Sequence, residues 1–114
     1  MQVLFVCTAN RERSRTAEIY FSVKYSLHRF RSAGINQYLS ERHGGVHLKK
    51  YMCDCADLII CMENCHSKYI LEKIDSKYKD KIRILELGDF ENYMSIEMIN
   101  VLNEKVEKII NQFF

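Results

Sequence analysis

The chain has 114 residues, a length that predicts a single domain, 1–114, with one buried core. Its residues are 47% apolar and 28% charged, as in ordinary globular proteins, and no apolar run is long enough to span a bilayer, so we expect no membrane association. The 17 basic and 15 acidic residues are mixed along the chain, and the net charge of +2 gives no case for a nucleic-acid partner.

The start of the chain and its cysteines bear on the cellular compartment. The apolar residues at the start have no basic leader and no long hydrophobic stretch, so they do not resemble a secretory signal. Five cysteines are an odd number, and in a chain of this kind free thiols are expected rather than a disulfide framework. We therefore expect a cytoplasmic protein.

Short apolar runs alternate with segments of helical composition along the chain. Each run is rich in β-branched, aliphatic or aromatic residues and stops at polar residues or glycine, as buried strands do. The predicted strands are residues 2–6, 28–34, 57–62 and 82–87. The predicted helices are residues 14–27, 47–56, 64–75 and 95–112, the first and last with the N-caps Ser14 and Ser95. The polar segment 35–47 is expected to have the least regular structure.

This alternation predicts an α/β fold with a central four-stranded parallel sheet and helices on both of its faces. The clearest helix is the last one, which has apolar residues on one face: Ile99, Leu102, Val106, Ile109 and Ile110. In such a sheet, ligands bind beyond the carboxyl ends of the strands. The turn that follows the first strand is therefore a candidate ligand site.

The stretch CTANRERS, residues 7 to 14, connects the first strand to the first helix. A helix N-terminus presents unpaired N–H groups and a partial positive charge, which favour a thiolate and hold an oxyanion. The spacing from Cys7 to Arg13 lets the backbone curl around one tetrahedral anion, with sulfur beneath it and a bidentate guanidinium beside it. The stretch predicts a phosphate-binding loop in which sulfur attacks phosphorus, formed by Thr8, Ala9, Asn10, Arg11, Glu12, Arg13 and Ser14.

The predicted loop contains no glycine, although such a turn needs a residue in the left-handed conformation. Asn10 adopts that conformation most readily after glycine, and Ala9 is small enough for a crowded turn. Ser14 follows the arginine, and its hydroxyl is placed to stabilise the Cys7 thiolate as the leaving group of a second step.

The motif Cys-x2-Asn-x2-Arg-Ser at the end of a strand resembles the signature of the low-molecular-weight protein tyrosine phosphatase family. The segments RSAG, residues 31–34, and ADLIICMENCH, residues 56–66, are similar to that family's second strand end and central strand, so the resemblance covers most of the chain to residue 75. It implies two-step hydrolysis of a phosphotyrosine protein or a small aryl phosphate, with no metal and no cofactor.

The resemblance also implies roles for individual residues. Cys7 would form a phosphocysteine, Arg13 would bind the equatorial oxygens, and an aspartic acid would protonate the leaving group and then activate water. Asn10 and Ser14 fall on the family's loop-shaping asparagine and thiolate-stabilising serine. Ser32 falls on a serine that supports the asparagine.

This chain departs from the family's pattern at four places. Ala9 stands where the family usually has glycine, Glu12 where it has a second cysteine, and Arg15 where it has proline. The family's acid lies in an Asp-Pro-aromatic segment, and this chain has no proline; Asp89, before Phe90, is the candidate acid. If that acid loop has been deleted, the acid is Glu86, Glu91 or no residue.

Two other functions remain open from the sequence. An arsenate reductase of the same fold would use further cysteines as a disulfide relay, and the candidates are Cys53, Cys55, Cys61 and Cys65. A non-catalytic phosphate-binding module would need no acid. The same four cysteines lack the paired spacing of zinc sites, so no metal is expected.

Overall fold

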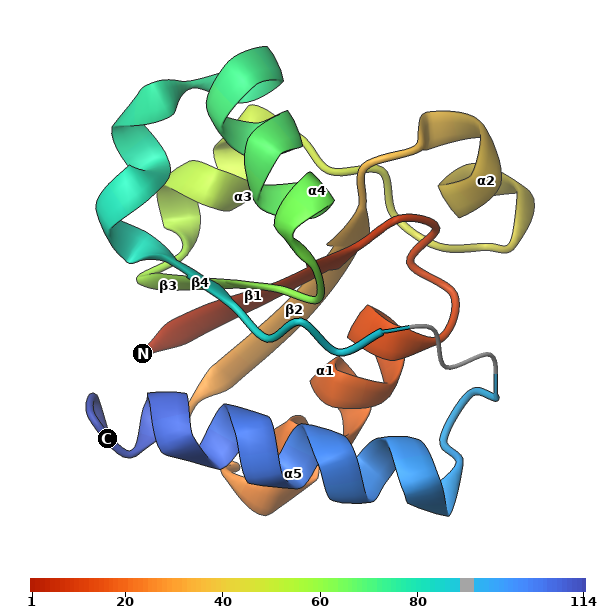
Figure 1. Ribbon diagram of the computed structural model, residues 1–114, viewed down its shortest axis with the longest axis vertical. Coiled ribbons are helices and arrows are strands. Elements are labelled where there is room, and N and C mark those ends of the chain that lie inside the picture. Colours follow the sequence, from red (N-terminus) through yellow and green to blue (C-terminus); the bar gives the residue numbers. More distant parts are fainter. Residues whose placement is uncertain (89–91) are drawn as a thin grey trace.

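The computed structural model describes residues 1–88 and 92–114, and its centre is a sheet of four parallel strands (Figure 1). The strands are β1 Gln2–Cys7, β2 Arg29–Gly34, β3 Leu58–Cys61 and β4 Ile82–Ile84. Their spatial order is β2-β1-β3-β4, and every neighbouring pair is parallel. This confirms the predicted four-stranded parallel sheet.

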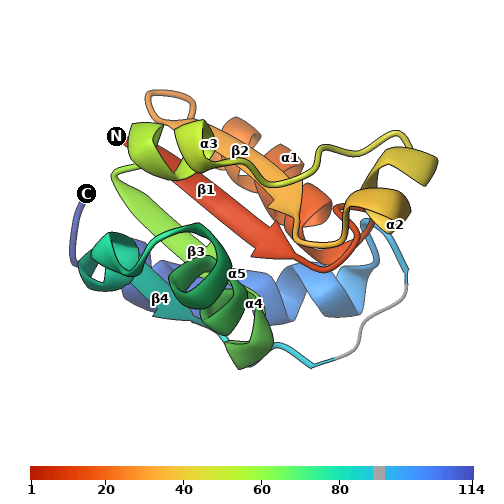
Figure 2. The ribbon, with the colours of Figure 1, turned by 90° about the horizontal axis from the view of Figure 1, so that it is seen from above.

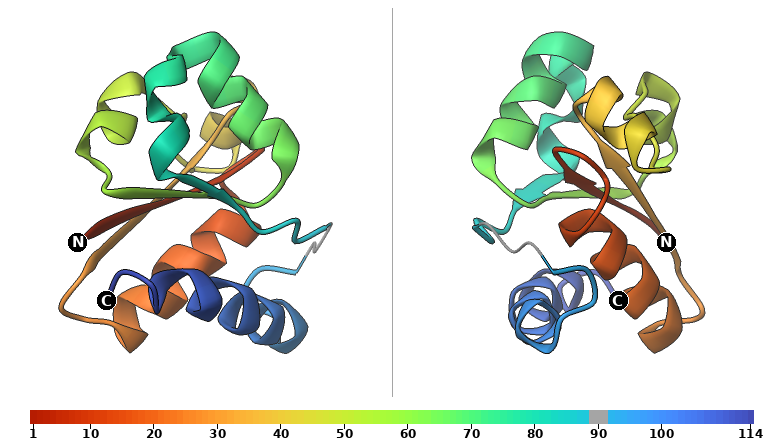
Figure 3. Two further views of the ribbon diagram at one scale, coloured as in Figure 1. Left: turned by 60° about the vertical axis from the view of Figure 1, so that its left-hand side comes forward. Right: turned by 90° about the vertical axis from the view of Figure 1, so that its right-hand side faces the viewer.

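Helices cover both faces of the sheet, because successive residues of a buried strand point to opposite sides. Val3 and Phe5 of β1 pack in one cluster with α1 and α5, whereas Leu4 and Val6 pack in a second cluster on the other face. Figure 3 shows α1 and α5 together on one side of the sheet, and Figure 2 looks onto the opposite layer, which contains α3 and α4. The helices are α1 Arg13–Lys24, α2 Gln37–Arg42, α3 Lys50–Cys55, α4 Asn64–Tyr69, the π-helical turn η1 Ile70–Ile74, the 3₁₀ helix η2 Ser76–Lys81 and α5 Ile96–Ile110.

The predicted boundaries differ from the observed ones where local contacts override composition. Residues 37–42 form the short helix α2, which the polar composition of this segment did not predict; Asn36 caps it by accepting a hydrogen bond from the Leu39 N–H at 3.0 Å. The predicted fourth strand ends early at Ile84. Glu86 has a φ of 54°, in the left-handed region, which an extended strand cannot contain.

The ends of the two longest helices were also predicted with mixed success. Ser95 caps α5 and accepts from the Met98 N–H at 3.2 Å, as expected. The N-cap of α1 is Glu12 rather than Ser14, which lies inside the first turn. The predicted helix 14–27 ends early, at Lys24, and Leu27 lies beyond its end and is 94% exposed.

The strand order places a crevice beside the end of β1. The chain leaves β1 toward β2 on one side and later crosses to β3 on the other, so the loops after β1 and β3 diverge at their carboxyl ends. Parallel sheets bind ligands at such a switch point. Within the described residues, no helix has the length and apolarity needed to span a membrane.

Candidate active site

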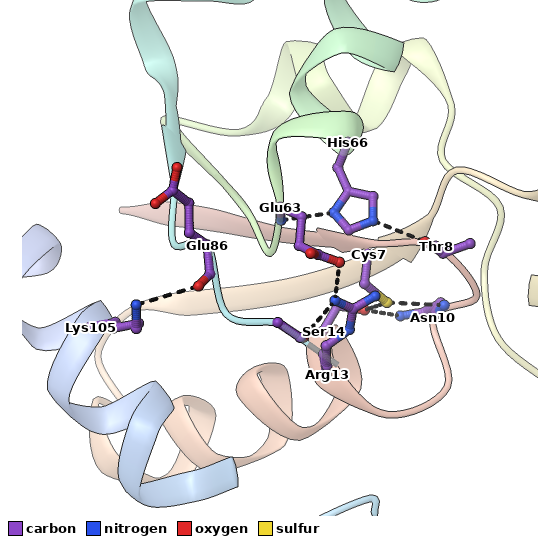
Figure 4. Close-up of polar contacts among 10 residues, drawn as sticks. Cys7, Thr8, Asn10, Arg13, Ser14, Glu63, His66, Glu86 and Lys105 are labelled. Carbon is purple, nitrogen blue, oxygen red and sulfur yellow. Dashed lines mark hydrogen bonds and ion pairs between the residues drawn. The ribbon is translucent and has the colours of Figure 1, made fainter. Parts of the chain in front are cut away.

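Cys7 ends β1 and lies at the base of the loop that leads into α1 (Figure 4). Its side chain is buried, and its sulfur lies 2.9 Å from the hydroxyl oxygen of Ser14. The backbone N–H of Asn10 donates to the same sulfur at 3.2 Å. Two hydrogen-bond donors therefore surround the sulfur and stabilise a thiolate there.

Asn10 organises the loop from its centre. Its φ of 49° places it in the left-handed region, as expected for the residue that substitutes for glycine. Its side-chain Nδ2 donates to the hydroxyls of Ser14 at 3.0 Å and Ser32 at 2.8 Å. Its Oδ1 accepts from the Val46 N–H at 2.8 Å. All the polar atoms of this buried amide are therefore paired within the fold.

These hydrogen bonds leave the Ser14 proton available to the sulfur. The Ser14 hydroxyl accepts from the Asn10 amide, and its own hydrogen can donate to the Cys7 sulfur when that sulfur is a thiolate. Ser32 likewise accepts from Asn10 and donates to the Glu18 carboxylate at 2.5 Å. A series of hydrogen bonds thus runs from Glu18 through Ser32 and Asn10 to Ser14 and holds the Ser14 hydroxyl beside the sulfur of Cys7.

The loop contains no glycine, but two segments that pack against it each have one at the point of contact, Gly34 and Gly45. A Cβ at Gly34 would lie 2.7 Å from the Thr8 carbonyl oxygen, and a Cβ at Gly45 would lie 2.7 Å from the Asn10 carbonyl oxygen. Both distances are far inside van der Waals contact with backbone. Because Gly34 and Gly45 have no side chain, the segments that contain them can pack closely against a loop that is built from larger residues.

Arg13 reaches across the crevice to the loop that follows β3. One of its terminal nitrogens, Nη1, donates to the Glu63 carboxylate at 2.6 Å and to the Gly88 carbonyl oxygen at 2.9 Å. Its side chain is only 12% exposed, so this ion pair is largely shielded from water. Guanidinium has five N–H donors, and those on Nε and Nη2 have no partner among residues 1–88 and 92–114. They form a fork that suits a phosphate.

His66 links the loop after β3 to the loop after β1. Its Nδ1 accepts from the Glu63 backbone N–H at 3.1 Å, which places the ring proton on Nε2, where it donates to the Thr8 hydroxyl at 3.0 Å. Burial, and after it the positive charge of Arg13, lowers the pKa of His66 to about 4, although Glu63 opposes the shift. His66 is therefore neutral at physiological pH.

The neutral state of His66 predicts lower stability in acid. In the unfolded chain, His66 binds a proton below its ordinary pKa of 6.5, whereas in the folded chain it binds one only near pH 4. Because the unfolded chain therefore binds more protons between these values, the free energy of unfolding declines as the pH falls from 6.5 to about 4. We expect a loss of about 3 kcal/mol in the free energy of unfolding over that range. Urea unfolding of the wild type and His66→Gln at neutral pH and near pH 4 measures it. Identical pH dependence in the two proteins would contradict the assignment.

The structure places the other predicted residues as follows. The Glu12 side chain pairs with Arg11 at 3.7 Å rather than with Arg13. Asp89, the candidate acid, lies outside the described residues, as do Phe90 and Glu91. Glu86 points away from the loop in Figure 4, so its carboxylate is not placed as the acid.

The sequence analysis identified neither Glu63 as a partner of Arg13 nor His66 as a partner of Thr8. His66 caps α4 and is fully buried. Both residues follow the strand next to β1, so the carboxyl edge of the sheet was the signal that could have found them.

The remaining cysteines do not form a disulfide among the described residues. Cys53 and Cys61 are buried, and burial raises the pKa of Cys53 to about 11, so it is protonated and a poor nucleophile. Glu63, Cys65 and His66 offer ligand atoms within 4.8 Å of one another. A metal ion there would compete with the contacts of Glu63 to Arg13 and of His66 to Thr8.

Comparison with solved structures gives full-length matches. A mutant of YwlE from Bacillus subtilis is 25% identical, with a TM-score of 0.77, and the match covers 98% of this chain and 97% of that one. A low-molecular-weight protein tyrosine phosphatase from T. tengcongensis is 24% identical, with a TM-score of 0.76 and 99% of both chains covered. The tyrosine phosphatase Wzb from Escherichia coli K30, in complex with phosphate, is 17% identical, with a TM-score of 0.78 and 99% and 98% covered.

In another of these structures, YwlE is an arginine phosphatase whose mutated active site carries a phosphorylated serine. No protein-family model and no curated protein matches this sequence.

Proposed function

We propose that this chain, which has the fold of the low-molecular-weight protein tyrosine phosphatases, hydrolyses phosphate monoesters through a phosphocysteine on Cys7. The observation that carries the proposal is the sulfur of Cys7 between the Ser14 hydroxyl and the Asn10 N–H, beneath a loop whose arginine has N–H groups without a partner among the described residues. A nucleophile, its stabilising donors and an anion-binding cation thus meet at one point.

In the first step, the Cys7 thiolate attacks phosphorus, and the ester oxygen leaves with its electron pair and takes a proton from an acid. The Arg13 fork and the backbone N–H groups of residues 8–13 stabilise the negative charge that spreads over the equatorial oxygens. In the second step, water attacks the phosphocysteine and releases phosphate. The Ser14 hydroxyl then stabilises the departing thiolate, because its proton is available to the sulfur.

The substrate class we propose is phosphotyrosine in a protein, or a small aryl phosphate. The arsenate-reductase alternative is weaker, because Cys53 is held protonated by burial and no second cysteine lies in the loop. We also propose that the protein acts in the cytoplasm, where its free thiols stay reduced.

The test is hydrolysis of para-nitrophenyl phosphate in the presence of a metal chelator. We expect turnover that persists with the chelator, since every proposed group belongs to the chain. Trapping by acid quench should yield a phosphoprotein in which the phosphate is bound to Cys7. Binding of aryl phosphates with no turnover would favour a phosphate-binding module instead. Turnover of arsenate that depends on added thiol and on a second cysteine would favour the reductase.

We propose Asp89 as the acid, because the Gly88 carbonyl that precedes it in the chain accepts from Arg13 at 2.9 Å. Replacement by Asn should slow hydrolysis of esters with poor leaving groups by about 100-fold and affect good leaving groups less, since only the former need a proton. A series of aryl phosphates of graded leaving-group pKa measures this. Equally small losses across the series would remove Asp89 from the mechanism.

A further inference from the structure

A cavity lined by two arginines borders the phosphate-binding loop. Its walls are Arg11, Arg15, Ile19 and Tyr93, and its volume is about 320 Å³. Arg11 belongs to the loop itself, Arg15 and Ile19 are one turn apart on α1, and Tyr93 comes from the turn before α5. The cavity therefore shares a wall with the phosphate site.

The turn that carries Tyr93 is fixed against α1. The backbone N–H of Met94 donates to the Thr16 hydroxyl at 2.9 Å, and Thr16 is buried in α1. The Ser95 N–H closes the turn onto the Asn92 carbonyl at 3.1 Å. Tyr93 is thus held beside the helix face that carries Arg15, and the cavity is part of the folded structure.

The cavity carries a positive charge. The Arg11 side chain is 57% exposed, and its one carboxylate partner among the residues that the structure describes is Glu12, 3.7 Å away, so this pair is weak and its cation stays available. Arg15 forms no ion pair within residues 1–88 and 92–114. Two guanidinium groups above the apolar surfaces of Ile19 and Tyr93 suit a carboxylate on a short aliphatic stem.

We propose that this cavity binds an acidic side chain next to the phosphorylated residue, so that the preferred substrate is an acidic phosphopeptide. The inference rests on the proposed phosphatase function, since it identifies which phosphotyrosine sites reach the loop. Arg15 is a specificity residue in this proposal: it acts on binding of the neighbouring residue and takes no part in bond breaking. Proline, which the resembling family has at this position, would offer no such charge.

The experiment compares two phosphotyrosine peptides that differ only in having Glu or Gln on both sides of the phosphotyrosine. We expect the wild type to favour the Glu peptide by about tenfold in kcat/KM, which is the size of effect that a few solvent-exposed charge contacts contribute. This ratio should decline with added salt, because salt screens such contacts. Arg15→Gln should bring the ratio toward one, and Arg15→Glu should reverse it. The ratio is internal to each protein, so partial misfolding of a variant does not mimic the effect.

Arg29→Gln is the matched control, because Arg29 pairs with Gln2 at the opposite, amino end of the sheet. It should keep the wild-type ratio. Equal use of the two peptides by the wild type, or a ratio that Arg15→Glu leaves unchanged, overturns the proposal. Fluorescence anisotropy with Cys7→Ser measures the corresponding ratio of the Kd values of the two peptides. Selective binding without any turnover would refute the phosphatase and keep the acidic-peptide site, whereas turnover without selectivity would do the opposite.

Discussion

Cys7→Ser should lose at least about 10⁴-fold in kcat with any aryl phosphate, the largest effect expected of a single substitution in this chain. Serine keeps the size and position of the side chain. Its hydroxyl is a far weaker nucleophile, because the two donors that stabilise a thiolate, Ser14 and the Asn10 N–H, cannot ionise an alcohol at neutral pH. Steady-state kinetics with para-nitrophenyl phosphate measures the loss.

Phosphate binding should survive the same substitution. In the proposed mechanism the N–H groups of the loop and the Arg13 fork bind the oxygens of the anion rather than its phosphorus, so titration calorimetry with inorganic phosphate should give a Kd within about threefold of the wild-type value. Cys55→Ser is the matched control, because Cys55 is exposed at the end of α3, away from the loop. Activity lost equally in the two variants would point to a thiol relay instead of a single nucleophile.

The positions of the strands could be predicted from the sequence because their signal is local. Residues 3–6 and 58–62 are continuous apolar runs, and a sheet with helices on both faces buries both sides of its strands. Every residue of β3 is buried. The alternation of such runs with helical segments was enough to predict the parallel direction of the strands, whereas their spatial order, β2-β1-β3-β4, comes from the structure.

The loop could be predicted in part for a different reason. The spacing of Cys7, Asn10, Arg13 and Ser14 lies within one strand-turn-helix unit, where chain connectivity alone brings the groups together. Glu63 and His66 are about fifty residues further along, and only the placement of β3 beside β1 brings them to the same loop. The rule that ligands bind at the carboxyl edge of a parallel sheet suggests that residues after β1 and β3 lie close together. A single sequence does not, however, give the side-chain rotamers that complete these contacts.

Helix α2 shows a limit of composition as a guide. Its residues are polar and mostly exposed, so they have no apolar period to detect, and only Ser40 is buried. The helix is nevertheless fixed at its start, where the Asn36 N–H donates to the Thr8 carbonyl at 2.9 Å. A contact with the loop after β1, rather than an amphipathic pattern, determines where this helix begins.

Arg13→Lys should lower kcat/KM by about 10³-fold, the second large effect we expect. Lysine keeps the charge but presents a single point donor in place of a planar fork, so it cannot hold two equatorial oxygens and the Glu63 carboxylate in one plane. Glu63→Gln should cost only about tenfold, because the amide still accepts a hydrogen bond from Nη1 while losing the charge that orients it.

The two substitutions together distinguish binding from positioning. If Glu63 acts by orienting the guanidinium, its replacement in the Arg13→Lys background should cost less than about twofold more, because the group that it orients is already gone. If Glu63 contacts the substrate independently, the two losses should multiply. Arg83→Lys is the matched control, since Arg83 lies in β4 and donates to the carbonyl of Asp80 at 3.0 Å, outside the crevice. A loss of less than tenfold in Arg13→Lys would remove the guanidinium fork from the mechanism.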